Sequence, residues 1–160
     1  MQQEVIPPAS PLLRQLVAAY VREEIEFPFL KAVTLAQWLL ESGRASSRLS
    51  RDYFNFAGLK WRSEMTGFAK PVSYEAHDGL CDYCRFASPA AFIHGYWRFM
   101  ERKPYEGWKT QAVDAASYLG AIIPTYCPDP GYVERVLRLL PEAEQLLAEA
   151  AREEVERLEG

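Results

Sequence analysis

The chain has few cysteines and no long apolar run, and each scarcity excludes a class of protein. Three cysteines among 160 residues are an odd number, so a complete set of disulfides is impossible. No stretch approaches the roughly 20 consecutive apolar residues of a membrane-spanning helix. The first residues, MQQEVIPPASP, contain neither a basic segment nor an apolar one, and we therefore expect no secretory signal there.

Basic residues are also too few for a surface that binds nucleic acid. The 18 Lys and Arg stand against 22 Asp and Glu, the net charge is −4, and no basic run forms a local exception. Because nucleic acids bind clustered cations through their phosphates, we expect no nucleic-acid partner. The phosphate loop, the dinucleotide-binding glycines and the G-x-S-x-G serine motif are missing as well. Of the two histidines, His94 lies in an apolar helical pattern and is expected in the core.

The residues that are abundant predict one globular domain. Apolar residues make up 49% of the chain and aromatic residues 13%, enough for a proper core at this length. Ser-Pro and Asp-Pro pairs mark several helix starts, and apolar residues recur at helical spacing after them. The predicted helices are 11–25, 29–42, a short one through 49, 89–100, 108–119, 130–140 and 142–158. Residues 71–87 predict a β-hairpin with its turn at Asp78-Gly79, so the fold class is α+β and mostly helical.

The segment AQWLLESG, residues 36–43, ends the predicted central helix with a single carboxylate, Glu41. Gly43 suits a left-handed cap that closes the helix. The simpler interpretation of Glu41 is a glutamate facing water at a helix end. The alternative is a carboxyl at the mouth of a cleft, whose apolar neighbours raise its pKa until it can act as a general acid.

The cysteines leave three interpretations open. Cys81 and Cys84 form a CDYC motif, His77 precedes it by four residues, and Cys127 lies far downstream. These four residues would make a Cys3His zinc site only if the fold brought Cys127 close to the other three. A local disulfide and free thiols are the other two interpretations.

Two carboxylates that face one another across a cleft commonly hydrolyse a bond between sugars. Glu41 is the candidate on a helix, and Glu75, with Asp78 as a second choice, is the candidate on the hairpin. The protonated carboxyl donates to the leaving oxygen, and the ionised one activates water or stabilises positive charge at the anomeric carbon. Aromatic residues that could stack on sugar rings or hydrogen-bond to them are Tyr53, Phe54, Trp61, Tyr126 and Tyr132.

Three motifs, in order, resemble the β-N-acetylglucosaminidase family of bacterial cell-wall hydrolases. AQWLLESG followed by NFAGLK resembles the family's "AQ-x-x-LESG-WG" helix and "N-x-F/G-G-I-K" turn, and YCPDPGYVERVL resembles its "YATDPxYxxKL" segment. The similarity covers about residues 30–140. It implies a lysozyme-like fold of two lobes, one helical and one a small hairpin, on either side of a groove for the peptidoglycan glycan strand. It also implies hydrolysis of the β-1,4 bond between N-acetylglucosamine and the following N-acetylmuramic acid, with no metal or cofactor.

The resemblance assigns roles to particular residues. Glu41 corresponds to the family's general acid, and Glu75 lies where the second carboxylate is expected. Tyr126 and Tyr132 correspond to tyrosines that line or brace the site. The remaining candidates for substrate binding are Asn55, Trp61 and Arg44. Arg44 is a departure, because ESGRA replaces the family's ESGWG and changes the shape of one sugar subsite while adding a cation.

Several alternatives remain open beside this assignment. A muramidase or a lytic transglycosylase would use the same scaffold, and a catalytically silent wall-binding module would keep the groove. The second step could be inverting or assisted by the substrate's own N-acetyl group. We expect residues 1–140 to form the catalytic domain, and residues 141–160 an acidic amphipathic helix that docks on it or contacts a protein partner. Action on the cell wall, in the periplasm or outside the cell, would then require a phage origin, an unconventional delivery route or a longer natural chain.

Overall fold

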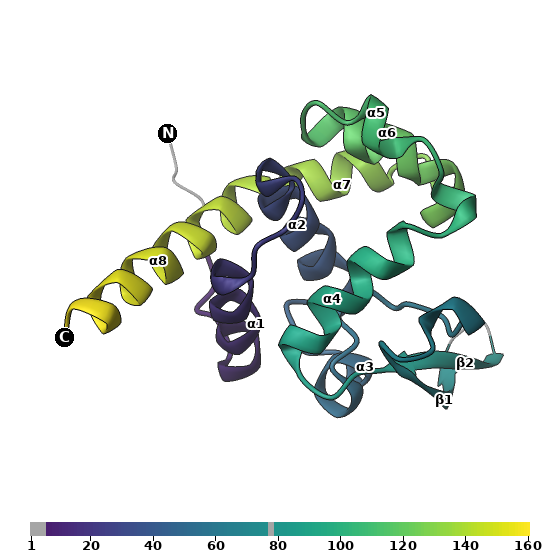
Figure 1. The fold of residues 1–160 in the computed structure, drawn as a ribbon, viewed down its shortest axis with the longest axis horizontal. Helices are drawn as coiled ribbons and strands as arrows, with labels where there is room; N and C mark the ends of the chain where they lie inside the picture. Colours follow the sequence, from purple (N-terminus) through teal and green to yellow (C-terminus); the bar gives the residue numbers. More distant parts are fainter. Residues whose placement is uncertain (1–5, 77–78) are drawn as a thin grey trace.

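A computed structural model describes residues 6–76 and 79–160. Helices dominate it, and one antiparallel hairpin lies at one end of the molecule, so the predicted α+β class is confirmed (Figure 1). The α-helices are α1 Pro11–Arg22, α2 Lys31–Ser42, α3 Arg48–Tyr53, α4 Pro89–Met100, α5 Trp108–Gln111, α6 Ala115–Tyr126, α7 Tyr132–Arg138 and α8 Leu140–Glu159. The strands are β1 Lys70–Ala76 and β2 Gly79–Arg85, and short 3-10 turns are η1 Pro28–Leu30, η2 Ser63–Met65 and η3 Lys103–Tyr105.

Helix α2 is the central helix, as its apolar sequence predicts. Figure 1 places it in the middle of the helices, with the hairpin at one end of the molecule and the free end of α8 at the other. Its Trp38 is fully buried, with its ring centroid 4.6 Å from that of Tyr20 on α1 and 4.9 Å from that of Phe92 on α4. Removing a buried side chain of this size costs about 3–5 kcal/mol, so α2 is held firmly between its neighbours.

The hairpin pairs in the register Lys70↔Arg85 through Ala76↔Gly79. Asp78, the predicted turn residue, lies outside the described residues. The loop that follows α3 runs along β2: the Cys84 N–H donates to the Leu59 carbonyl at 2.9 Å. The hairpin is therefore tied by backbone hydrogen bonds to the loop that contains the AGLK sequence.

Two predicted helix boundaries are wrong, one of them because a local cap overrides apolar periodicity. The helix predicted over 108–119 is broken into α5 and α6. Asp114 accepts a hydrogen bond from the Ser117 N–H at 2.8 Å, and the Ser117 hydroxyl accepts one from the Asp114 N–H at 3.0 Å. This reciprocal cap starts a new helix. The first helix also ends earlier than predicted, at Arg22, because Glu23 adopts an extended conformation.

Two further predictions are wrong: the start of the helix near Pro130 and the core position of His94. The helix expected to start at Pro130 begins at Tyr132, since Asp129 holds the preceding turn by accepting from the Gly131 N–H at 2.9 Å. His94 is not in the core: its side chain is 60% exposed and its Nε2 lies 3.1 Å from a Glu23 carboxylate oxygen. The apolar face of α4 passes through the positions beside it and leaves His94 on the outer side.

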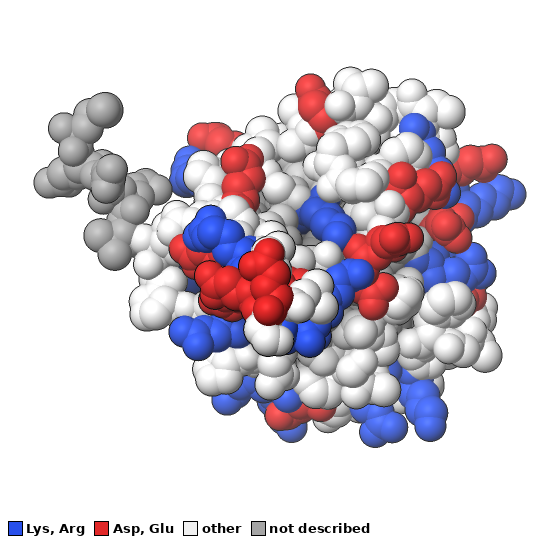
Figure 2. All heavy atoms as spheres, turned by 60° about the vertical axis from the view of Figure 1, so that its left-hand side comes forward, with Lys and Arg blue, Asp and Glu red and all other residues white. Residues whose placement is uncertain are grey.

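Helix α8 packs against α1 and α2 and extends beyond them (Figure 1). Its first turn is fixed by two hydrogen bonds, each 2.8 Å, between the Arg44 guanidinium and the Glu142 carboxylate. Figure 2 shows acidic and basic side chains interspersed on one face of the molecule, so neither sign dominates that face. Within the described part of the chain, no helix is both long and apolar enough to cross a bilayer.

Candidate active site

Glu41 lies in the last turn of α2, and a left-handed turn fixes its position. Gly43 has φ 56° and ψ 50°, which confirms the predicted cap, and Arg44 and Ala45 continue with φ of 56° and 64°. The Gly43 N–H contacts the carbonyls of the preceding turn. A carboxylate at the C-terminal end of a helix meets the negative end of the helix dipole, which disfavours its ionised form.

The Glu41 side chain opens into a cleft of about 420 Å³. Residues 57–60 and Arg62 form one wall of the cleft, and the end of α4 with the turn after it forms another. The end of α6, from Thr125 to Cys127, completes the lining. Among the described residues that line this cleft, Glu41 is the only carboxylate.

Asn55 shapes the wall that faces Glu41. It is 1% exposed, and its amide donates to the carbonyls of Leu59 at 3.0 Å and Cys84 at 2.9 Å, while its oxygen accepts from the Leu59 N–H at 3.0 Å. This loop carries Gly58 with φ +62°, and a Cβ on Gly58 would lie 3.9 Å from Glu41 Oε2. Glycine therefore allows the backbone to adopt this conformation close to the carboxylate.

A chain of buried hydrogen bonds leads from Glu41 into the core. Tyr132 acts on the Glu41 carboxylate as a hydrogen-bond donor that lowers its pKa, and its hydroxyl accepts from Gln37 Nε2 at 3.4 Å. The Gln37 carbonyl oxygen accepts from the Tyr96 hydroxyl at 2.7 Å, and the Tyr118 hydroxyl lies 2.6 Å from that of Tyr96. Because Tyr96 donates to Gln37, Tyr118 is the donor in the last pair. Every donor in the chain is thus directed towards Glu41.

The pKa of Glu41 is raised, as the alternative interpretation of its sequence context expects. Desolvation by the surrounding atoms is the largest cause, although one side of the residue remains open to solvent. The hydrogen bond from Tyr132 and the positive charge of Arg135 oppose this rise without cancelling it. Glu41 therefore keeps its proton to a higher pH than an ordinary glutamate, which is the property of a general acid.

Tyr126 is one of the aromatic residues that line the cleft, together with Phe99 and Tyr105. Its hydroxyl donates to the Ala57 carbonyl at 3.2 Å, which links the end of α6 to the loop facing Glu41. Its ring centroid lies 6.1 Å from that of Tyr132 and 6.4 Å from that of Tyr105. Burial raises the pKa of Tyr126 well above its ordinary value, so the hydroxyl stays neutral and can serve as a hydrogen-bond donor.

Comparison with known proteins decides the family. A family model for glucosaminidases, described as mannosyl-glycoprotein endo-beta-N-acetylglucosaminidase, matches residues 17–145. The chain belongs to the glucosaminidase family. It is therefore a glycoside hydrolase, and the matched residues include Glu41, the cleft and the hairpin. No curated protein sequence matches the chain.

Three solved structures of low sequence identity are similar to this chain in fold. The glycoside hydrolase domain of Salmonella typhimurium FlgJ has a TM-score of 0.61 at 18% identity, with 91% of this chain and 92% of that chain covered. The catalytic domain of the Listeria monocytogenes autolysin Auto has a TM-score of 0.51 at 16% identity, with 89% and 90% covered. A Staphylococcus aureus N-acetylmuramoyl-L-alanine amidase has a TM-score of 0.62 at 21% identity, with 92% of this chain but only 46% of that chain covered.

The structure gathers some of the predicted site residues and separates others. Glu41 and Tyr126 line the cleft, Tyr132 contacts Glu41, and Asn55 lies behind the loop. The remaining three do not line this cleft: Glu75 is exposed on β1 opposite Leu80, Trp61 lines a separate hollow beside the hairpin, and Arg44 binds Glu142. The substrate and catalytic roles of these three stay predictions.

Sequence reasoning missed Gln37, Tyr96 and Tyr118. A usable signal exists only for Gln37, a polar residue in an apolar run, one helical turn before Glu41 and so on the same face of α2. The two tyrosines lie on α4 and α6 and show no such local signal. Their hydroxyls matter because packing directs them towards Gln37.

The cysteines of this glucosaminidase are free thiols in the structure. Cys84 is buried, and burial raises the pKa of its thiol to about 12. Cys127 lines the cleft, and His77 lies outside the described residues. Over 6–76 and 79–160, no group of three or more His, Cys, Asp or Glu side chains could hold a metal ion.

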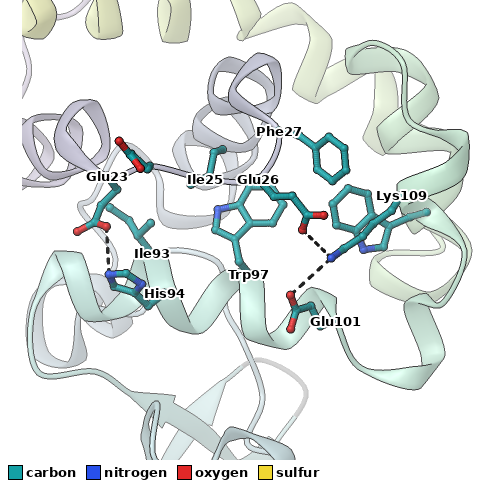
Figure 3. A pocket seen from close by; sticks show the side chains of 11 residues that line it. Glu23, Ile25, Glu26, Phe27, Ile93, His94, Trp97, Glu101 and Lys109 are labelled. Atoms are coloured by element: carbon teal, nitrogen blue, oxygen red, sulfur yellow. Dashed lines mark hydrogen bonds and ion pairs between the residues drawn. The ribbon is translucent and has the colours of Figure 1, made fainter.

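A second cavity, of about 170 Å³, lies between the segment after α1 and the side of α4 and shares no lining residue with the cleft (Figure 3). Its charged groups contact one another: Lys109 Nζ is 2.7 Å from a Glu26 oxygen and 3.6 Å from a Glu101 oxygen, and His94 contacts Glu23. These contacts hold the charged side chains in place at the rim of the cavity.

Proposed function

We propose that this glucosaminidase hydrolyses the glycan strands of peptidoglycan, at the bond between N-acetylglucosamine and the following N-acetylmuramic acid. Family membership supports a glycosidic bond as the target. The three sequence motifs and the likeness in fold to an autolysin catalytic domain support the bacterial cell wall as the substrate and the site of action. The observation that carries the proposal is Glu41, a carboxyl of raised pKa that opens into a cleft.

In the proposed mechanism, Glu41 begins protonated and donates its proton to the leaving glycosidic oxygen. Positive charge then develops at the anomeric carbon, and the Glu41 carboxylate that forms is stabilised by the hydrogen bond from Tyr132. The Tyr132 hydroxyl is itself held by Gln37. The hydrogen-bond chain therefore stabilises the carboxylate that Glu41 becomes after it donates its proton. The pKa of Glu41 is still raised, so the residue remains protonated before that step.

We assign the second step, activation of the attacking water, to Glu75. The assignment rests on the family resemblance alone, because Glu75 is exposed on β1 and does not line the cleft. The competing route uses the N-acetyl group of the substrate as the nucleophile and needs no second protein carboxylate. Glu75→Gln separates the two routes, with Asp82→Asn as a matched exposed carboxylate on the same hairpin. Loss of roughly 100-fold in kcat for Glu75→Gln alone supports the water route, and wild-type activity removes Glu75 from that role.

The decisive test is digestion of purified peptidoglycan by the wild type and by Glu41→Gln, followed by borohydride reduction and mass analysis of the released sugars. Reduced N-acetylglucosamine ends from the wild type, with kcat lower by roughly 10²–10⁴-fold in the variant, are the expected result. Reduced muramic ends indicate a muramidase, and anhydro-muramic ends a lytic transglycosylase. Binding to the wall without release of sugars by either protein would indicate a silent wall-binding module.

We also propose that residues 1–140 carry the catalytic unit and that residues 141–160 form a helix docked on it. The contact of Arg44 with Glu142 and the packing of α8 on α1 and α2 support docking. A chain truncated after residue 140 is expected to lose thermal stability, because the truncation removes these contacts together with the helix. An unchanged melting temperature would favour a role for this segment in binding a protein partner.

A further inference from the structure

The cleft beside Glu41 is cationic although the whole chain is acidic. Its described lining contains Lys60, Arg62 and Arg102 and a single carboxylate, Glu41, whereas the net charge of the chain is −4. When Glu41 is protonated, as its acid role requires, the lining carries positive charge alone. Concentrated charge of one sign in a cleft attracts a ligand of the opposite sign.

Arg102 is the least exposed of these cations. It lies two residues after the end of α4, and its side chain is only 7% exposed. Its Nε donates to the Phe99 carbonyl at 3.2 Å, and its guanidinium carbon lies 3.9 Å from the centroid of the Phe99 ring. These contacts hold the guanidinium in one orientation but occupy only one of its nitrogen atoms.

The remaining nitrogens of Arg102 have no hydrogen-bond acceptor among the described residues. The nearest carboxylate partner is Glu64, whose Oε2 is 3.8 Å from Arg102 Nη1, beyond hydrogen-bond distance, and whose side chain is 43% exposed. These nitrogens are not among the fully buried polar atoms without a partner, so they keep contact with solvent while most of the side chain is desolvated. Arg102 thus has bonding capacity that the described chain does not use.

Arg62 adds a second positive charge to the same part of the cleft. Burial lowers the pKa of Arg102, Tyr105 and Glu64 oppose this effect, and the positive charge of Arg62 adds to it by repulsion. Both guanidiniums also act on Tyr105, where they oppose the rise in pKa that burial causes. The two arginines therefore reinforce one positive potential, and an anion between or beside them would relieve their repulsion.

We propose that Arg102 and Arg62 form a subsite that binds a carboxylate of the substrate. The inference rests on the proposed function, since peptidoglycan strands carry carboxylates and neutral N-acetylglucosamine polymers do not. The carboxylate comes either from the stem peptide or, on strands without peptides, from the lactyl group of the muramic sugar. A planar guanidinium binds a carboxylate through two parallel hydrogen bonds. The subsite fixes the position of the carboxylate-bearing sugar relative to Glu41 and so selects the bond that is cleaved.

The test compares three soluble substrates: strands with stem peptides, strands stripped of peptides, and stripped strands whose lactyl carboxylates have been converted to amides. The variants are Arg102→Met, Arg102→Lys and the exposed Arg62→Gln, with Arg138→Gln on the outer surface of α7 as the control. We expect kcat/KM to fall by roughly 10- to 100-fold on a carboxylate-bearing strand and to stay unchanged on the amidated strand. Arg102→Lys should restore part of the loss, and Arg138→Gln should change nothing.

Each result has a distinct meaning. A loss confined to peptide-bearing strands identifies the stem carboxylate, and a loss on stripped strands identifies the lactyl carboxylate; both support the subsite. Equal losses on charged and amidated strands, or no loss for Arg62→Gln and either Arg102 variant, overturn it. If Arg102→Met fails to fold, Arg62→Gln carries the same comparison alone. If the wild type cleaves none of the three substrates, the proposed function fails instead.

Discussion

Tyr132→Phe tests the link between the hydrogen-bond chain and the acid. The change removes only the hydroxyl that donates to Glu41 and accepts from Gln37. A hydrogen bond to a carboxylate stabilises its ionised form, so losing the bond makes ionisation harder and raises the pKa of Glu41 further. A general acid works while it is protonated. The alkaline limb of the pH profile should therefore move to higher pH.

The size of this displacement follows from the hydrogen bond. A hydrogen bond to a charged group contributes about 1.5–3 kcal/mol, and the lower end applies because Glu41 is partly open to solvent and its interactions are screened. Since about 1.4 kcal/mol corresponds to one pH unit, the alkaline limb should move up by about one unit. Gln37 Nε2 also loses its acceptor in the core, so unfolding should become easier by roughly 1–3 kcal/mol.

The assay is kcat/KM for peptidoglycan strands over a pH series, together with an NMR titration of the Glu41 side-chain carbon. Tyr20→Phe is the matched control. It removes another buried hydroxyl, bonded to Thr34 on the same helix at 2.6 Å but outside the chain that leads to Glu41. This control should lose stability while its pH profile stays at the wild-type position. An alkaline limb that stays in place or moves to lower pH in Tyr132→Phe would refute the assigned donor direction.

Three further predictions concern stability. Burial raises the pKa of Glu41, so between pH 4.5 and that raised pKa the folded state binds more protons than the unfolded state, and stability falls as pH rises. Glu41→Gln should therefore melt higher than wild type at pH 7. The gain should shrink as pH falls through the raised pKa and vanish below pH 4.5. Gly95→Ala would place a Cβ 2.2 Å from a ring carbon of Phe86, and the free energy of unfolding measured with denaturant should fall by about 1–3 kcal/mol. Gly120→Ala, on an open helix face, is the matched control and should stabilise the protein by about 0.5–1 kcal/mol. Gly58→Ala, at φ +62°, should cost roughly 1–2 kcal/mol and lower activity through its methyl beside Glu41; unchanged melting and activity would contradict the strained loop.

Local features of the sequence were enough to predict the elements that present the acid. The apolar run before Glu41 predicts a buried helix, and Gly43 predicts its left-handed end, because both depend on residues within a turn or two. The serine caps of α1 and α4 are predicted for the same reason. The break before α6 was missed because the Asp114–Ser117 cap interrupts a helix that periodicity alone would continue.

The chemistry around the acid depends on contacts between distant parts of the chain. Gln37 meets Tyr132 across 95 positions and Tyr96 across 59, so only packing decides that these hydroxyls point towards Glu41. Arg102 is a similar case. The sequence around it is that of an ordinary helix end, and only its burial beside the cleft leaves a cation with N–H donors that the described chain does not use. The sequence by itself determined the helix, its cap and the carboxyl. The tertiary structure decided how strongly that carboxyl holds its proton, because desolvation and long-range hydrogen bonds exist only after the chain has packed.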